Sequence, residues 1–225
     1  MWVTQGRPHV TLKSAVTLDG KIADVHGSSR WITGEDARAE THRLRSLSDA
    51  ILVGIRTALA DDPALTVRLP QPWPREPYRI VLDPRARLSP EARVVTSGTP
   101  ARTIVAVGDQ ASSDALERLR ISGASVVRCP SDGVGLDLRH LLRWLATRDV
   151  TSLLVEGGGE TSATFLESGL VDRVAVFVAP MLLGGRAAPT AVGGQGRALK
   201  DALRLRDVTV RRLGADVLIE GDVET

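Results

Sequence analysis

The chain has 225 residues, of which 43% are hydrophobic and 25% are charged, and its formal net charge is +2. This length and balance suit a globular α/β protein, and no segment approaches the ~18–20 uncharged apolar residues of a membrane helix. The arginines are scattered and aromatic residues are few, which argues against a nucleic-acid-binding surface. Cys129 is the single cysteine and the four histidines are not spaced as ligands, so we expect neither a disulfide nor a metal site.

Strands and helices are predicted alternately along the first part of the chain. Residues 7–16 alternate between small or apolar side chains and a second set that includes Lys13, which predicts a first strand. After a loop, a helix is expected to start at Thr33, because Asp36 follows at the spacing of a capping box. Next come a buried strand, a short helix and a proline-rich surface loop, at residues 50–54, 55–60 and 69–77.

The same alternation continues to the end of the chain. Further strands are predicted at residues 78–83, 93–96, 102–108, 124–129, 151–156 and 172–180. Further helices are predicted at residues 113–120, 136–147 and 161–168. Residues 204–223 indicate two strands that turn at Gly214, so we expect a mostly parallel α/β sheet with antiparallel strands at its C-terminal end. No linker or repeat divides the sequence, and we expect residues 1–225 to form a single domain.

The stretch VEGGGETSATFL, residues 155–166, joins a predicted strand to a predicted helix through three glycines. Free N–H groups at a helix N-terminus bind anions, and glycine lets a phosphate come close. The alternative is a tight strand-to-helix turn with glycines at positive φ, and these residues alone leave both interpretations open. The dinucleotide fingerprint G-x-G-x-x-G is not met, because Ser162 holds its last position. Glu156, at the strand end, is either a ligand of a ribose hydroxyl or ring N–H, or a solvated acid.

Six more side chains have both a functional and an ordinary interpretation. Lys13 lies inside a strand of small and apolar residues, so it needs a partner or a cleft unless it reaches solvent from an edge. Trp31 either stacks on a ligand or packs its loop onto the core. Asp61 and the aspartate after it are either an acid–base pair or the end of a helix before an Asp-Pro turn. Arg45 and Arg68 are either phosphate clamps or solvated charges.

Several segments occur in one order, and together they are more specific than any one of them: LKSAVTLDGKIA, SRWITGEDAR, AILVGIRTALADDPALTVR, LLVEGGGETSATFL and APMLLGG. From about residue 7 to residue 221 the chain resembles the reductase domain of bacterial riboflavin biosynthesis, the RibD C-terminal family. The resemblance implies a dihydrofolate-reductase-like fold, with a mixed, mostly parallel sheet flanked by helices, in a homodimer. It also implies hydride transfer from NADPH to C1′ of 5-amino-6-(5-phosphoribosylamino)uracil, or its diaminopyrimidine precursor, whose ribosyl group becomes ribityl.

The family pattern implies roles for individual residues of this chain. Cofactor-binding positions are Ala15, Trp31, Thr33, Thr57, Asp61, Gly158, Gly159, Glu160, Thr161 and Thr164, the last five around the pyrophosphate. Substrate-binding positions are Ser29, Arg45, Leu65, Arg68 and Glu156, together with Lys13. Arg45 and Arg68 would hold the sugar 5′-phosphate, and Glu156 would lie near the reacting carbon. Lys13, Asp61 and Glu156 are the unranked candidates to assist proton transfer.

The resemblance leaves the wider setting and two alternatives open. The family domain usually follows a zinc deaminase, and the H-x-E…P-C-x-x-C signature is missing here, so we expect a separate deaminase to act in the same pathway. The N-terminus lacks the layout of a signal peptide, and we expect a cytoplasmic protein. One alternative is a dihydrofolate- or pterin-type reductase, which would not need Arg45 and Arg68 as phosphate clamps. The other is a non-catalytic nucleotide-binding module, which would not need Lys13 and Glu156.

Overall fold

The computed structural model describes residues 6–71, 73–131, 133 and 135–224, which divide into two compact units. Unit 1 comprises Arg43–Leu154 and the residues up to His9, and unit 2 comprises Val10–His42 and Val155–Thr225. Within the described part of the chain, no helix is long and apolar enough to cross a membrane.

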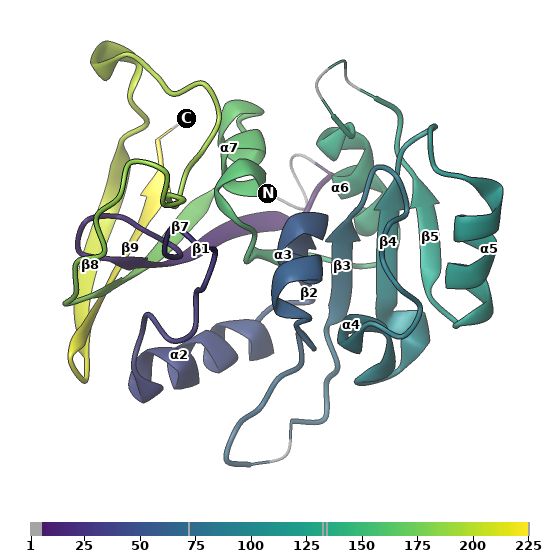
Figure 1. Ribbon diagram of the computed structural model, residues 1–225, viewed down its shortest axis with the longest axis horizontal. Helices are drawn as coiled ribbons and strands as arrows, with labels where there is room; N and C mark the ends of the chain where they lie inside the picture. Colours follow the sequence, from purple (N-terminus) through teal and green to yellow (C-terminus); the bar gives the residue numbers. More distant parts are fainter. Residues whose placement is uncertain (1–5, 72, 132, 134, 225) are drawn as a thin grey trace. The chain divides into compact units, whose positions relative to one another are not determined.

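Unit 1 is a parallel sheet whose strands are connected mainly through helices. Its strands are β2 (Ala50–Gly54), β3 (Tyr78–Leu82), β4 (Thr103–Val107), β5 (Ser125–Arg128) and β6 (Ser152–Val155). Its helical segments are α3 (Ile55–Asp61), α4 (Arg93–Thr96), the 3-10 turn η1 (Pro100–Arg102), α5 (Ser113–Ile121) and α6 (Leu138–Ala146). The strand order is β5-β4-β3-β2-β6, and Figure 1 shows β3, β4 and β5 side by side, with α5 next to β5.

The apolar runs of the sequence explain this core. Every residue of β2 and of β4 is buried, as expected for parallel strands that are covered on both faces. Val53, Val81 and Val105, one from each of three neighbouring strands, belong to a single buried cluster that also holds Leu116 and Leu119 of α5. Successive strands therefore place their valines in one layer under the helix.

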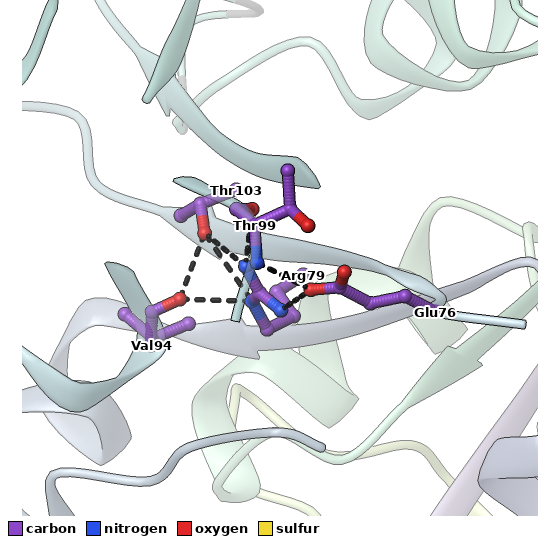
Figure 2. A network of polar contacts seen from close by, with 5 residues as sticks. All are labelled: Glu76, Arg79, Val94, Thr99 and Thr103. Atoms are coloured by element: carbon purple, nitrogen blue, oxygen red, sulfur yellow. Dashed lines mark hydrogen bonds and ion pairs between the residues drawn. The ribbon is translucent and has the colours of Figure 1, made fainter. Parts of the chain in front are cut away.

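A charged network lies inside unit 1, around Arg79 of β3 (Figure 2). The side chain of Arg79 is 1% exposed, and its guanidinium forms an ion pair with Glu76. Its Nε donates to the Val94 carbonyl at 2.9 Å, and its Nη2 donates to the Thr99 carbonyl at 2.7 Å and to Thr103 Oγ1 at 3.0 Å. A buried charge is tolerated only when it is paired and hydrogen-bonded. The network thus fastens the segment from α4 to β4 onto β3.

Unit 2 is built on a mixed four-stranded sheet. Its strands are β1 (His9–Thr17), β7 (Arg173–Ala179), β8 (Leu205–Leu213) and β9 (Asp216–Val223), in the order β1-β7-β9-β8. It also holds α7 (Gly159–Glu167), the 3-10 turn η2 (Leu199–Asp201) and the first part of α2 (Glu35–Ser46). β1 pairs with β7 in parallel, whereas β9 pairs antiparallel with both β7 and β8. The predicted mixed, mostly parallel sheet with antiparallel C-terminal strands is confirmed.

The predicted strand at residues 93–96 is wrong, because these residues form α4. Thr96 N donates to the Ala92 carbonyl at 3.1 Å, which closes a helical turn. The amide of Arg93, in the first turn, donates to Asp62 Oδ1 at 2.8 Å. A partner 31 positions earlier in the chain therefore favours a helix where the short apolar run alone suggested a strand.

Two helix starts also differ from the prediction. α2 begins at Glu35 and not at Thr33, because Gly34 holds the N-cap position, where its carbonyl accepts from Arg38 N at 3.1 Å. The Gly34 amide donates to Asp216 Oδ2 of β9 at 2.7 Å, so a distant carboxylate anchors this end of the helix. α7 begins at Gly159, two residues before the predicted start at 161, so the last glycine of the turn belongs to the helix.

Candidate functional site

β1 presents Lys13 and Ala15 on one half-buried face, as its alternating burial predicts. Ala15 lies opposite Phe177 in the pairing of β1 with β7, and Lys13 Nζ stands 5.3 Å from the centroid of the Phe177 ring. An ammonium group over an aromatic face is attracted by the negative charge of the ring face. Lys13 is therefore held on the face that carries Ala15, and the predicted alternation of this strand is confirmed.

The loop between β1 and α2 carries Ser29, Trp31 and Thr33. Trp31 is 67% exposed, so it does not pack its loop onto the core, and ligand stacking stays a prediction. The Arg38 guanidinium of α2 lies 4.6 Å from the Trp31 ring centroid and donates to the Thr33 carbonyl at 2.9 Å. Sequence reasoning missed Arg38. Its position one turn into the predicted helix could have indicated that it reaches back to the loop that carries Trp31 and Thr33. Ser29 is half-buried in the same loop.

The glycine turn at the start of α7 does not use left-handed backbone. Gly158 is the N-cap with φ −71° and ψ 175°, and none of residues 157–159 is among the positive-φ glycines of the described chain. Close approach requires glycine instead: a Cβ on Gly157 would lie 2.5 Å from Thr161 Cβ, and one on Gly159 would lie 2.4 Å from the Thr190 carbonyl oxygen. The interpretation as a positive-φ turn is wrong, and two of the three glycines are required by packing within unit 2.

The segment around Thr190–Gly193 is the neighbour that sequence reasoning missed at this turn. Gly193 N donates to the Gly159 carbonyl at 3.0 Å, and a Cβ on Gly193 would lie 2.5 Å from Glu160 Oε1. Thr164 Oγ1 donates to the Glu160 carbonyl at 2.9 Å, so this hydroxyl is used inside the helix. No side chain caps the helix at Gly158 in the described structure. The first amides of α7, with Gly158 at their head, are therefore the part of the turn suited to an anion.

Asp19 holds together two of the segments that carry the family resemblance. Its carboxylate accepts from the Thr17 hydroxyl at 2.6 Å, from Gly184 N at 2.7 Å and from Leu183 N at 3.1 Å. The Thr17 hydroxyl, followed by the Gly184 amide, lowers the pKa of Asp19 from 3.8 to about 2. Sequence reasoning missed this residue: the acid before Gly20 signals a turn, but two of its three partners lie 164 and 165 positions further on.

We expect Asp19→Ala to speed hydrogen exchange at the Leu183 and Gly184 amides at neutral pH, because both lose their acceptor. Since folding depresses this pKa, the stabilisation by the hydrogen bonds to the Asp19 carboxylate is fully present above pH 3.8. It is lost as the pH falls through about 2. An NMR titration of the wild-type carboxyl should therefore have its midpoint near 2. Asp109→Ala, in an exposed turn, is the control and should leave the exchange of both amides unchanged. Unchanged exchange in Asp19→Ala would contradict the assignment.

α3 carries Thr57 and Asp61, and the segment that follows it carries Leu65. The next residue after α3, Asp62, is its C-cap with φ 39°, and its carboxylate accepts from the first residue of α4, so Asp62 ends one helix and anchors another. Asp61 is half-buried at the last position of α3. Leu65 is 2% exposed and belongs to the core cluster, with φ 51°, a conformation uncommon outside glycine. Any contact of Leu65 with a ligand must therefore come from its backbone.

The two candidate phosphate clamps are joined to the same segment. Arg45, near the end of α2, donates from Nη1 to the Thr66 carbonyl at 3.0 Å. Arg68, two residues after Thr66, is exposed. The Arg45 guanidinium is thus bound to the stretch of chain that carries Arg68. Two guanidinium groups can together hold a phosphate at several of its oxygens.

The fold places the chain in the dihydrofolate-reductase-like class of α/β proteins. It aligns with dihydrofolate reductase from Enterococcus faecalis at a TM-score of 0.53 and 11% identity, over 98% of each chain, a likeness of fold alone. The chain belongs to the RibD C-terminal domain family, whose model matches residues 8–219. The family resemblance predicted from the sequence motifs is confirmed.

Several proteins similar to this chain have names that refer to riboflavin biosynthesis. The chain is 42% identical to 2,5-diamino-6-ribosylamino-4(3H)-pyrimidinone 5′-phosphate reductase of Methanothermobacter thermautotrophicus, over 97% of this chain and 99% of that protein. It is 38% identical to riboflavin biosynthesis protein RibD of Actinobacillus pleuropneumoniae, over 97% of this chain but only 58% of that protein. The structure of Acinetobacter baumannii RibD superposes with a TM-score of 0.86 at 29% identity, over 100% of this chain and 60% of that one. The chain thus spans a little over half of the RibD proteins and nearly all of the archaeal reductase.

Proposed function

We propose that this protein is an NADPH-dependent oxidoreductase that converts the ribosyl group of a phosphoribosylamino-pyrimidine into the ribityl group, in riboflavin biosynthesis. The observation that carries the proposal is the 42% identity to the archaeal 5′-phosphate reductase over 99% of its length. The substrate is 5-amino-6-(5-phosphoribosylamino)uracil or its diaminopyrimidine precursor. A pterin reductase is the weaker alternative, because an unphosphorylated pterin offers nothing for Arg45 and Arg68 to clamp. A non-catalytic module would have no use for Lys13 and Glu156.

The reaction needs one hydride and one proton. The lone pair of the exocyclic nitrogen forms a C1′=N bond as the C1′–O4′ bond breaks, and O4′ takes a proton. Bound NADPH would supply the hydride that C1′ accepts, and the C1′=N bond would become a single bond. Positioning and exclusion of water matter more here than a strong nucleophile. The candidates for the proton transfer are Lys13, Asp61 and Glu156, whose side chains are ionisable and half-buried.

The cofactor-binding residues of this proposal fall into two groups. We assign the pyrophosphate to the first turn of α7, where Gly158 is a bare N-cap and the amides of Gly159, Glu160 and Thr161 follow. The other cofactor-binding positions are Ala15, Trp31, Thr33, Thr57, Asp61 and Thr164. Because the Thr164 hydroxyl is bonded within the helix, its contribution would be to shape the surface of α7.

The substrate is assigned to Arg45 and Arg68 for its 5′-phosphate and to Glu156 for the region of C1′. Arg45 is already oriented by the Thr66 carbonyl, so a phosphate would meet a partly ordered guanidinium group. Lys13 sits over Phe177 on the same face as Ala15, which suits it to meet the sugar beside the cofactor. Ser29 and the backbone of Leu65 are the remaining substrate contacts in this proposal.

Purified protein is expected to oxidise NADPH in the presence of the pyrimidine phosphate, and the loss of NADPH absorbance measures this oxidation. Arg68→Ala should raise KM for this substrate about tenfold to a hundredfold, because a charge-assisted hydrogen bond contributes about 1.5–3 kcal/mol. It should change KM for the dephosphorylated substrate much less. Arg120→Ala, on the exposed side of α5, is the matched control. No turnover of either pyrimidine, or efficient turnover of dihydrofolate that ignores Arg68→Ala, would overturn the proposal.

The same proposal includes the setting of the enzyme. A separate deaminase acts on the same pyrimidine, before or after the reduction, and both steps take place in the cytoplasm. The chain forms one reductase domain over residues 1–225 and works as a homodimer.

A further inference from the structure

One guanidinium on α2 contacts two residues of the preceding loop that are assigned to the cofactor. Arg38 Cζ lies 4.6 Å from the centroid of the Trp31 ring, and Arg38 Nη1 donates to the Thr33 carbonyl at 2.9 Å. A cation over the face of an indole is attracted by the negative charge of that face. Arg38 therefore orients Trp31 and brings a positive charge to one face of its ring.

The start of α2 fixes the backbone from which Arg38 reaches the loop. The Arg38 amide donates to the Gly34 carbonyl at 3.1 Å, and the Gly34 amide donates to Asp216 Oδ2 of β9 at 2.7 Å. The first turn of the helix is thus bound to the sheet of unit 2. A long side chain loses conformational entropy when it is ordered, and the ring and the carbonyl together offset that loss for Arg38. The charge therefore has one defined place behind the indole.

The second face of the Trp31 ring is open to a ligand. Trp31 is 67% exposed although Arg38 covers one face, so its exposed surface is mainly the opposite face and the edge of the indole. Aromatic faces of this kind stack on other flat rings. Because Trp31 is assigned to the cofactor, a cofactor ring would complete a stack that has the indole in the middle and Arg38 behind it.

The surroundings of Trp31 select which of the two cofactor rings it meets. Ser29, two positions earlier in the same loop, is assigned to the substrate. On β1, Ala15, which is assigned to the cofactor, shares one face with Lys13, which is assigned to the substrate. The nicotinamide is the ring that must meet the substrate, because it carries the hydride. This part of unit 2 is therefore the nicotinamide end of the site, a step that rests on the function proposed above.

The nicotinamide ring differs in charge between the two forms of the cofactor. It is neutral in NADPH and carries one positive charge in NADP⁺, whereas the phosphates of the two forms are the same. An open indole alone attracts a cationic ring more strongly than a neutral one, and would thus favour the oxidised form. A positive charge already present on the other face of the indole opposes that preference, because like charges repel.

We propose that Arg38 is a specificity-determining residue, which makes the site prefer the reduced cofactor, NADPH, to the oxidised cofactor, NADP⁺. Across one indole, at the effective dielectric constant of a protein surface, the repulsion is equivalent to roughly tenfold in a ratio of dissociation constants. Glu35 opposes this effect only weakly, because its carboxylate lies 3.7 Å from Arg38 Nη2 but its side chain is 94% exposed. The preference favours binding of the hydride donor and release of NADP⁺ after the reaction.

The dissociation constants of NADPH and NADP⁺, measured by calorimetry without substrate, test the proposal. Their ratio is the informative quantity, because both forms carry the same phosphates and any loss of affinity common to both cancels. Arg38→Met should lower the ratio of the NADP⁺ constant to the NADPH constant about tenfold, because the opposing charge is gone. Arg38→Lys keeps the charge and should leave this ratio within about twofold of wild type, even where both constants rise.

Arg148→Met is the matched control. Arg148 Cζ lies 4.0 Å from the Trp144 ring centroid in unit 1, the same kind of contact, and neither residue is assigned to a ligand. This variant should change neither dissociation constant. Circular dichroism spectra equal to that of the wild type would confirm that each variant is folded.

Two results would overturn this inference alone. One is a ratio in Arg38→Met equal to that of the wild type, and the other is a ratio that falls equally in Arg38→Lys, which would show that the shape of the side chain matters and its charge does not. A wild-type protein that binds neither nucleotide would overturn the proposed function together with this inference. The binding measurements need no substrate, so their result is separate from that of the activity test.

Discussion

Glu156→Gln is expected to lower kcat for the pyrimidine phosphate about 10²- to 10⁴-fold, the range contributed by a general acid or base. Glutamine keeps the size and hydrogen-bonding reach of the side chain but can neither carry the negative charge nor exchange a proton. Glu156 directly follows β6, at the carboxyl end of a strand in a mostly parallel sheet, where ligands of such sheets bind. The dissociation constant for NADPH, measured by fluorescence, should change less than about threefold, because the cofactor is assigned to the amides of α7.

Glu117→Gln is the matched control for this experiment. Glu117 lies on the exposed side of α5, in unit 1, and its nearest basic partner is Arg120 at 3.8 Å. Its substitution should change neither kcat nor NADPH binding. If Glu156→Gln retains full turnover, the solvated-acid interpretation is correct. If it weakens NADPH binding as strongly as it lowers kcat, Glu156 is a cofactor ligand and not a substrate contact.

Arg79→Met is expected to lower the free energy of unfolding by about 2–4 kcal/mol, because it removes the buried member of an ion pair whose other member, Glu76, is 33% exposed. The substitution leaves the Glu76 carboxylate without its guanidinium partner and removes the Arg79 donor to the Thr99 carbonyl. It also removes one of two donors to the Val94 carbonyl, which still accepts from Thr103 Oγ1 at 2.7 Å. Methionine fills much of the volume, so the loss comes from unpaired polar groups more than from a cavity. Chemical denaturation followed by circular dichroism measures the change.

Two further variants separate the buried charge from charge in general. Arg120→Met removes an exposed arginine whose ion pair with Glu117 is long, and it should change the free energy of unfolding by less than about 1 kcal/mol. The double variant Glu76→Gln with Arg79→Met should recover part of the loss, because no unpaired charge remains. A single variant Arg79→Met as stable as wild type would show that the network in Figure 2 is not required for stability.

Local patterns predicted the sheet because most of its strands are marked by their own residues. The largely apolar runs of β2, β3 and β4 correctly predicted buried parallel strands, and the alternation around Lys13 correctly predicted the two faces of β1. The turn at Gly214, with φ 61°, correctly predicted the final hairpin. These features depend on neighbours within a few residues, which the sequence displays directly.

The features that local patterns did not predict depend on partners far along the chain. The first amide of α4 donates to the carboxylate of Asp62, and the N-cap amide of α2 donates to that of Asp216. A glycine is required at position 159 because the carbonyl of Thr190 lies close to it. The residues of the candidate site also divide into those that local motifs predicted and those that depend on distant partners. The site residues of β1 and α3 were predicted from their motifs, whereas Asp19 was missed because two of its three partners, the amides of Leu183 and Gly184, lie more than 160 positions away. A sequence without its contacts cannot show which distant backbone will come within reach.

The pairing of β1 with β7 has a consequence for how the chain is made. Thr11 of β1 pairs with Arg173, so the first strand of unit 2 has no β7 beside it until more than 160 further residues have been added. Unit 1, in contrast, has all five of its strands once residue 155 is in place. Because the chain is synthesised from its N-terminus, the parallel sheet of unit 1 can form before β7 has been synthesised and can pair with β1. This pairing closes a loop of more than 160 residues, and contacts of such high sequence separation slow folding.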